Sequence, residues 1–274
     1  MPELRIFDVH QHLPEHIPNI QTEQALIQRD LDYRLRVMDK HRIQAGAIMA
    51  SLLYDRPNGV ADTRRMNDYV AWYRDRHRDR FPVGIGTVEP IHGLEQGLLE
   101  INRIATELKL DGLVWHNHFA GMALDHYRMV AFVNALGDLG LPAFVHVREP
   151  YEHETPTRLE NLAQRAPATA IVAMGVMTGA QRLGELHGVG ERCPNVVFET
   201  SLVWPLNNWI DRFVEFFGSQ RVIFGTDLHY HEAPSYRHPP GLADVLESDK
   251  LTDDDRENIL WANAARLFPL PLYT

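Results

Sequence analysis

The chain has 274 residues, a single cysteine, few lysines and no long uninterrupted apolar segment. With only Cys193 present, an intrachain disulfide is excluded, and its position beside Pro194 and ahead of an apolar run favours a packing role. No apolar run approaches the roughly 18 residues that a membrane-spanning helix requires. These absences predict a globular protein that does not cross a membrane.

An excess of positive charge is also missing, because the formal net charge is -10 at pH 7. Nucleic acids and anionic membrane surfaces repel a domain of this charge, so neither is an expected partner and a small-molecule substrate is. The first residues contain no basic segment followed by an apolar one. We therefore expect no secretory signal and a cytoplasmic protein.

Short apolar runs alternate with longer amphipathic segments along the whole chain, which is typical of repeated βα units. Strands are predicted at 4–9, 45–51, 82–88, 112–116, 143–147, 170–175, 196–199 and 222–225. Helices are predicted near 24–40, 63–78, 94–108, 125–137, 156–165, 180–187, 205–217 and 252–267. No linker rich in proline, glycine or serine interrupts the series, so residues 1–274 are predicted to form a single domain.

The count of these units favours a (β/α)8 TIM barrel, because eight parallel strands joined by helices close into a barrel of about 250 residues. An open doubly wound sheet is the main alternative. Its glycine-rich phosphate loop is missing, since the glycines at 84 and 86 are followed by TVEP rather than by a helical segment.

Two histidines stand one residue apart at the end of the first predicted strand. His10 and His12 point the same way, because side chains in extended backbone alternate with period two. Neutral imidazole is the commonest protein ligand of divalent transition metals, and two imidazoles supply half of a four- or five-coordinate site. The pair therefore indicates a metal site, with surface loop histidines as the alternative interpretation.

Polar side chains follow most of the other predicted strands. In a parallel barrel the carboxyl ends of the strands converge on one mouth, so these residues become neighbours there. They are Glu89, His116, His118, His146, Arg148, Glu149, Glu199, Asp227, His229 and His231. A random distribution would place more of the 15 histidines on helix surfaces. The clustering predicts an active site at the mouth.

Several motifs make the chain resemble the amidohydrolase superfamily of metal-dependent (β/α)8 barrels, in the branch of dicarboxylate lactonases and aminocarboxymuconate semialdehyde decarboxylases. They are FDVHQH at 7–12, DGLVWHNHFAG at 111–121, LPAFVH at 141–146, RVIFGTD at 221–227 and NAARLF at 263–268. The resemblance covers nearly the whole chain. It implies an enzyme with one or two divalent metal ions, zinc first and iron or manganese as alternatives, held by His10, His12, His146 and Asp227. It also suggests a homo-oligomer.

Two positions depart from the pattern that the resemblance implies. Met174 stands where the family usually has a strand-six histidine, and Val114 stands where many members carry a lysine that is modified to bridge two metals. A thioether cannot transfer a proton, and no bridging carbamate forms at a valine. Glu199 is therefore a candidate to ligate the metal or to hold a ligand histidine by its second nitrogen, with a salt bridge in the barrel mouth as the alternative.

Catalysis is assigned to Asp227 and to His116, which is a candidate base, accessory ligand or hydrogen-bond donor to the substrate. An arginine in the position of Arg148 can clamp a substrate carboxylate, or it can pair with Glu149. The predicted substrate-binding residues are Arg148, His118, Trp115, His229 and His231.

The leading expectation is a metal-dependent hydrolase that acts on an activated acyl bond, an ester, lactone or thioester, of a small apolar or carboxylated substrate. A divalent metal generates hydroxide from bound water at neutral pH, and Asp227 would accept the proton. The alternative is a metal-dependent non-oxidative decarboxylase of a carboxylated aromatic or enoic acid. A second alternative, motivated by Met174 and Val114, is a barrel that binds a ligand without turnover.

Overall fold

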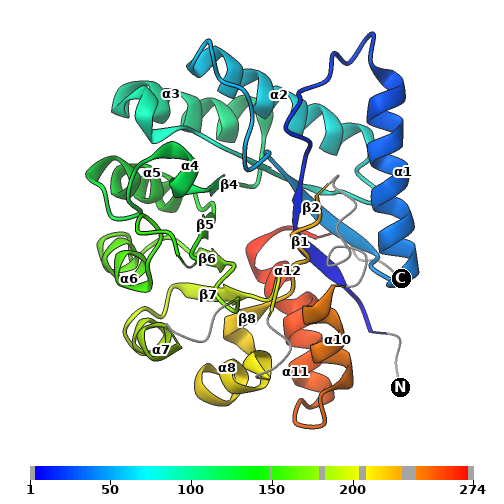
Figure 1. Cartoon of the computed structure of the whole chain (residues 1–274), viewed down its shortest axis with the longest axis vertical. Helices are drawn as coiled ribbons and strands as arrows, with labels where there is room; N and C mark the ends of the chain where they lie inside the picture. Colours follow the sequence, from blue (N-terminus) through cyan, green and yellow to red (C-terminus); the bar gives the residue numbers. More distant parts are fainter. Residues whose placement is uncertain (1–3, 149, 179–182, 204–207, 230–238, 271–274) are drawn as a thin grey trace.

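Eight parallel strands form one sheet in this computed structural model, and their spatial order follows their order in the chain (Figure 1). The structure describes residues 4–148, 150–178, 183–203, 208–229 and 239–270. The strands are β1 (Phe7–His12), β2 (Ala45–Met49), β3 (Val83–Gly86), β4 (Gly112–Trp115), β5 (Ala143–His146), β6 (Ile171–Met174), β7 (Val196–Glu199) and β8 (Val222–Ile223). The predicted (β/α)8 barrel is confirmed.

Helices form a ring outside the strands (Figure 1). They are α1 (Gln24–Lys40), α2 (Val60–Arg76), α3 (Leu94–Arg103) with the π-helical turn η2 (Ile104–Leu108), α4 (Asn117–Ala120), α5 (Tyr127–Asp138), α6 (Pro156–Arg165), α7 (Leu183–Arg192), α8 (Trp209–Phe217), α10 (Pro240–Glu247), α11 (Asp253–Glu257), η4 (Asn258–Ala262) and α12 (Asn263–Leu267), with short 3-10 turns η1 (Pro90–His92) and η3 (Ser219–Arg221). The predicted starts at 180 and 205 lie outside the described residues. Among the helices that are described, none is long and apolar enough to cross a membrane.

Local sequence explains where several helices begin. Thr155 accepts a hydrogen bond from the Arg158 backbone, and Pro156 occupies the first turn of α6, where its missing N–H costs nothing. Thr252 and Asp255 form a reciprocal capping box at the start of α11. These caps fix the helix starts independently of the barrel core.

The strands read as continuous apolar runs because helices and barrel interior cover both of their faces. All residues of β2 to β6 are buried. Met174 of β6 is fully buried and lies in register with His146 of β5. The barrel wall thus has an apolar side chain where a further histidine would face the site.

The first strand extends further along the chain than predicted, through both candidate metal-ligating histidines. It was expected at 4–9 with the histidines beyond it, whereas β1 runs from Phe7 to His12 and contains both. The strand continues because its backbone pairs with the segment after β8: the His12 amide donates to the Leu228 carbonyl at 2.9 Å, and the Leu228 amide donates to the His10 carbonyl at 3.2 Å. Both imidazoles are therefore held by sheet geometry.

A buried carboxylate closes the seam between β1 and β8. The Asp8 carboxylate accepts hydrogen bonds from the Thr226 amide at 2.9 Å, the Thr226 hydroxyl at 2.6 Å and the His10 amide at 3.0 Å. Burial raises the pKa of Asp8 to about 6, although these hydrogen bonds act to lower it. The seam is tight: a Cβ on Gly225 would meet Glu199 Oε1 at 2.1 Å and His10 Cβ at 2.8 Å.

We predict that Gly225→Ala destabilises the protein by roughly 1–3 kcal/mol, because the neighbouring buried side chains cannot move aside. The measurement is the free energy of unfolding from urea denaturation. Gly184→Ala is the matched control, since no described heavy atom lies within 4 Å of its added Cβ, and a helical alanine should be neutral or stabilising. Equal stability of the two variants would contradict the close packing at the seam.

Candidate metal centre and active site

Three side chains from the two ends of the chain converge at the barrel mouth. His10 Nε2 lies 2.9 Å from His12 Nε2 and 3.2 Å from Asp227 Oδ1, and His12 Nε2 lies 3.8 Å from the same oxygen. His10 and His12 come from β1, and Asp227 follows β8. Asp227 has a backbone φ of 57°, a left-handed conformation that aspartate adopts more readily than most residues. We call these three residues the first cluster.

A hydrogen bond behind the ring orients His12, whereas His10 faces a carboxylate there, with Nδ1 3.5 Å from Glu199 Oε1. His12 Nδ1 lies 2.7 Å from the Ala50 carbonyl, so Nδ1 carries the hydrogen and Nε2 keeps its lone pair for the cluster. Burial lowers the pKa of His12 well below its usual range, and the ring is neutral. Burial also acts to lower the pKa of His10, but the charges of Asp227 and Glu199 outweigh it and raise the pKa to about 9.

The donor set fits a divalent metal ion. Ligand atoms about 2.0–2.1 Å from one ion lie roughly 2.9–3.4 Å apart in octahedral or tetrahedral coordination, and the first cluster has nearly this spacing. Two buried imidazole nitrogens facing each other at 2.9 Å are otherwise satisfied only if one of them is protonated. The cluster therefore has the chemistry and the dimensions of a metal site.

Glu199 lies behind His10 instead of joining the first cluster. Its Oε1 is 3.5 Å from His10 Nδ1, on the ring edge opposite the cluster, and the same carboxylate accepts from the Ser201 amide at 2.8 Å and the Ser201 hydroxyl at 2.6 Å. Glu199 is fully buried at the end of β7. Its position suits a carboxylate that orients a ligand histidine.

A second cluster of three residues occupies the β4–β5 side of the mouth. The Glu154 carboxylate lies 2.6 Å from His146 Nδ1 and 2.8 Å from His118 Nδ1, and it also accepts from the His118 amide at 2.9 Å. Burial acts to raise the pKa of Glu154, but the hydrogen bonds from the two histidines outweigh it and lower the pKa. The ionised carboxylate keeps hydrogen on both Nδ1 atoms and leaves both Nε2 atoms with lone pairs.

His116 links the two clusters. Its ring centroid lies 4.9 Å from that of His12 and 5.0 Å from that of His146. Burial and the neighbouring His146 hold the pKa of His116 well below its usual range, so its ring is neutral near pH 7. His146, the predicted fourth ligand, thus belongs to the second cluster, and its ring lies beside that of His116.

His229 is the next neighbour of the first cluster. Its Nε2 lies 2.7 Å from Asp227 Oδ1, and its ring stacks on His12 with centroids 4.8 Å apart. Burial acts to raise the pKa of Asp227, but the charges of His10 and His229 outweigh it and lower the pKa. Asp227 is therefore a carboxylate, and His229 holds the shared hydrogen.

The remaining residues predicted for the site do not belong to either cluster as far as the structure describes them. Trp115 is buried in the barrel wall, where its Nε1 donates to the Val88 carbonyl at 2.7 Å, and it borders a cavity of only about 10 Å³ beside His116. Arg148 is exposed, with its Cβ close to Gly175. His231 and Glu149 lie outside the described residues.

Reasoning from the sequence did not identify two buried acidic residues of the site. Glu154 follows β5 by eight residues, in a loop whose conformation no periodic pattern indicates, and Asp8 points away from the mouth within β1. The histidine and acidic residues at 152–154, just before the helix-starting Pro156, were the only signal for Glu154. The sequence contains no signal for the role of Asp8, because an acid within an apolar strand is identified as structural only once its partners are known.

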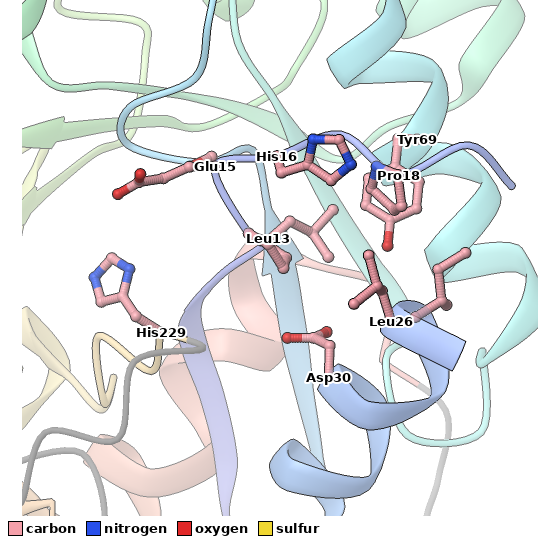
Figure 2. A pocket seen from close by; sticks show the side chains of 11 residues that line it. Leu13, Glu15, His16, Pro18, Leu26, Asp30, Tyr69 and His229 are labelled. Atoms are coloured by element: carbon pink, nitrogen blue, oxygen red, sulfur yellow. The ribbon is translucent and has the colours of Figure 1, made fainter. Parts of the chain in front are cut away.

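A cavity of about 260 Å³ adjoins the first cluster. It lies between the segment after β1 and the first turn of α1, and His229 forms its wall on the metal-site side (Figure 2). This volume is close to the lower bound, roughly 300 Å³, of ordinary small-molecule sites. The mouth therefore has room for a small organic ligand beside the first cluster.

Comparison with known proteins gives one family and a set of similar folds. The family model described as Amidohydrolase matches residues 7–270. The chain is similar to 5-carboxyvanillate decarboxylase from Sphingomonas paucimobilis, with 20% identity, coverage of 98% of this chain and 100% of that chain, and a TM-score of 0.74. It is also similar to 2,6-dihydroxybenzoate decarboxylase from Rhizobium, with 17% identity, coverage of 98% and 99%, and a TM-score of 0.67.

A third similar structure was solved with a metal. It is 5-carboxyvanillate decarboxylase from Novosphingobium aromaticivorans complexed with manganese and 4-hydroxy-3-methoxy-5-nitrobenzoic acid, with 18% identity, coverage of 98% and 97%, and a TM-score of 0.73. No curated protein matches the chain in sequence. Likeness at these identities shows the shared fold, and together with the donor groups it supports a divalent metal.

These findings correct the expected reaction. The three structures named above are decarboxylases, which contradicts the expectation of acyl-bond hydrolysis and favours the alternative. His10, His12 and Asp227 form a ligand set that suits several reactions, so the ligands alone do not specify which bond breaks. The prediction of a hydrolase, with an ester, lactone or thioester as substrate, was therefore wrong.

We predict that Glu154→Gln lowers the affinity for a divalent metal roughly 10- to 100-fold, because an amide cannot accept from both Nδ1 atoms and His146 loses its orientation. Affinity is measured by competition with a chelator of known strength. Glu152→Gln, two residues away and exposed, is the matched control and should bind metal like the wild type. Unchanged affinity in Glu154→Gln would show that the second cluster does not act on the metal site.

Proposed function

Because the chain belongs to the amidohydrolase family, we propose that it is a metal-dependent, non-oxidative decarboxylase of a carboxylated aromatic or enoic acid. The observation that carries the proposal is the position of Asp227, within 3.2 Å of His10 Nε2 on one side and 2.7 Å of His229 Nε2 on the other. One carboxylate thus joins a metal-ligand cluster to a hydrogen donor. The decarboxylase neighbours support the same reaction class.

In this proposal His10, His12 and Asp227 hold the ion, with His146 as a further ligand from the second cluster. When bound, a divalent ion supplies positive charge that attracts a carboxylated substrate and stabilises negative charge on it. We propose manganese, which suits the carboxylate donor and is present in a similar structure, with zinc and iron, which suit the imidazole donors, as the alternatives.

The chain's own residues handle the proton. Loss of carbon dioxide breaks a carbon–carbon bond and leaves the electron pair on the carbon that carried the carboxylate, which then takes up one proton. We assign this proton to the Asp227–His229 pair, whose hydrogen lies between Nε2 and Oδ1, and solvent restores it after each turnover. His116 is neutral, so it suits a hydrogen bond to the substrate better than proton delivery.

Carbon dioxide release tests the proposal. Protein supplied with manganese should release carbon dioxide from an aromatic acid in a panel that includes 2,6-dihydroxybenzoate and 5-carboxyvanillate. Asp227→Asn should lower this rate at least about 100-fold, because the pair loses its acid–base function. Asp249→Asn, at an exposed site, is the control. Formation of acid from esters or lactones without carbon dioxide would contradict decarboxylation.

Metal content tests the ligand assignment separately. We expect about one equivalent of divalent metal per chain in protein purified without chelator, and its loss in the His10→Ala/His12→Ala double variant, as measured by elemental analysis. His187→Ala on α7, where the ring packs against Phe216 and Phe217 of α8, should keep the metal. Full retention of metal in the double variant would place the ion elsewhere.

A further inference from the structure

The cavity beside the first cluster is lined by apolar and polar side chains from the segment after β1, from α1 and from α2. Leu13, Pro18 and Leu26 contribute to this lining, and Asp30 and Tyr69 add polar groups to it (Figure 2). Leu13 directly follows the candidate ligand His12. His229 contacts both the cavity and the first cluster: it lines the cavity, and its Nε2 lies 2.7 Å from Asp227 Oδ1. The cavity and the first cluster are therefore separated by the thickness of one side chain, that of His229.

One polar group in the cavity lacks a partner. The Tyr69 side chain is 2% exposed, and within the described part of the chain its hydroxyl makes no hydrogen bond. Figure 2 shows this hydroxyl pointing into the cavity toward Leu26. Burial and the charge of Asp30 raise the pKa of Tyr69, so the hydroxyl keeps its hydrogen. A buried hydroxyl without a partner destabilises a protein, and a ligand that supplies the partner removes that cost.

The neighbouring acid does not offer a free charge. The Asp30 carboxylate accepts two hydrogen bonds from the Arg34 guanidinium, each 2.9 Å long, and one from the Tyr73 hydroxyl at 3.1 Å. Charge within this part of the cavity is thus balanced. A second carboxylate on a ligand would find no uncompensated cation there, whereas a neutral hydroxyl fits both the apolar walls and Tyr69.

We propose that this cavity is the subsite for the body of the substrate, and that it selects an acid whose apolar body carries a neutral hydroxyl at the end remote from the carboxylate. Tyr69 is the specificity-determining residue in this proposal, because its hydroxyl pairs with that of the substrate. The inference rests on the proposed function for the carboxylate at the first cluster. The cavity's preference for a hydroxyl is a separate property.

Matched pairs of ligands distinguish binding of the carboxylate from the preference of the cavity for a hydroxyl. The acid pair is 4-hydroxyphenylacetate and phenylacetate, and the neutral pair is 4-methylphenol and toluene, with binding measured by isothermal titration calorimetry. In each pair the hydroxylated compound should bind roughly three- to tenfold more tightly, the effect of one ordinary hydrogen bond. Tyr69→Phe should erase this difference in affinity and leave the affinity for the unhydroxylated compounds unchanged. Tyr127→Phe, at an exposed tyrosine, should retain the difference.

A second variant fills the cavity without touching the buried core. Leu26 is 47% exposed at the cavity edge, so Leu26→Trp should fold normally and abolish binding of both members of each pair. Leu99→Trp, at a comparably exposed leucine on α3, is its control. The inference is overturned if wild-type protein binds none of the probes, if Tyr69→Phe keeps the preference, or if Leu26→Trp binds as the wild type does.

Ligand binding and carbon dioxide release test the subsite and the decarboxylase separately. A Tyr69-dependent preference for 4-methylphenol, with no carbon dioxide released from any acid of the panel, would keep the subsite and refute the decarboxylase. Carbon dioxide release without that preference would keep the decarboxylase and refute the subsite.

Discussion

The closure of the barrel between β1 and β8 is the constraint on which the candidate site depends. Asp8 reaches across this seam to Thr226, the residue before Asp227, and also holds the His10 amide. The three donors of the first cluster thus come from backbone that one buried carboxylate ties together. Gly225 lets the two segments approach closely enough, because any side chain there would overlap Glu199.

Buried charge around the mouth is balanced in local groups. Glu199 lies behind His10, and Glu154 holds His118 and His146. The Asp30–Arg34 pair extends this arrangement to the cavity, since Arg34 Nη2 also donates to the His12 carbonyl at 2.6 Å. A buried ion pair compensates its own desolvation only with further hydrogen bonds of this kind. The same arginine therefore connects the cavity to the strand that carries the histidine pair.

The sequence alone predicted the barrel and the convergence of its polar residues, because apolar periodicity and strand-end histidines are local signals. It missed the extension of β1 through His12, which depends on pairing with the segment after β8. It also missed Glu154, whose loop has no periodic pattern. The hydrolase expectation was wrong for a different reason: His10, His12 and Asp227 are a ligand set that suits several reactions, and their presence does not specify which bond breaks.

The central claim is that the first cluster, and not the second, holds the metal. A crystal of the protein grown with manganese, measured near the manganese absorption edge, tests it directly through anomalous scattering. We expect one strong anomalous peak bounded by His10, His12 and Asp227, with Glu154 still bonded to both of its histidines. A peak between His118, His146 and Glu154, with none at the seam, would contradict the account.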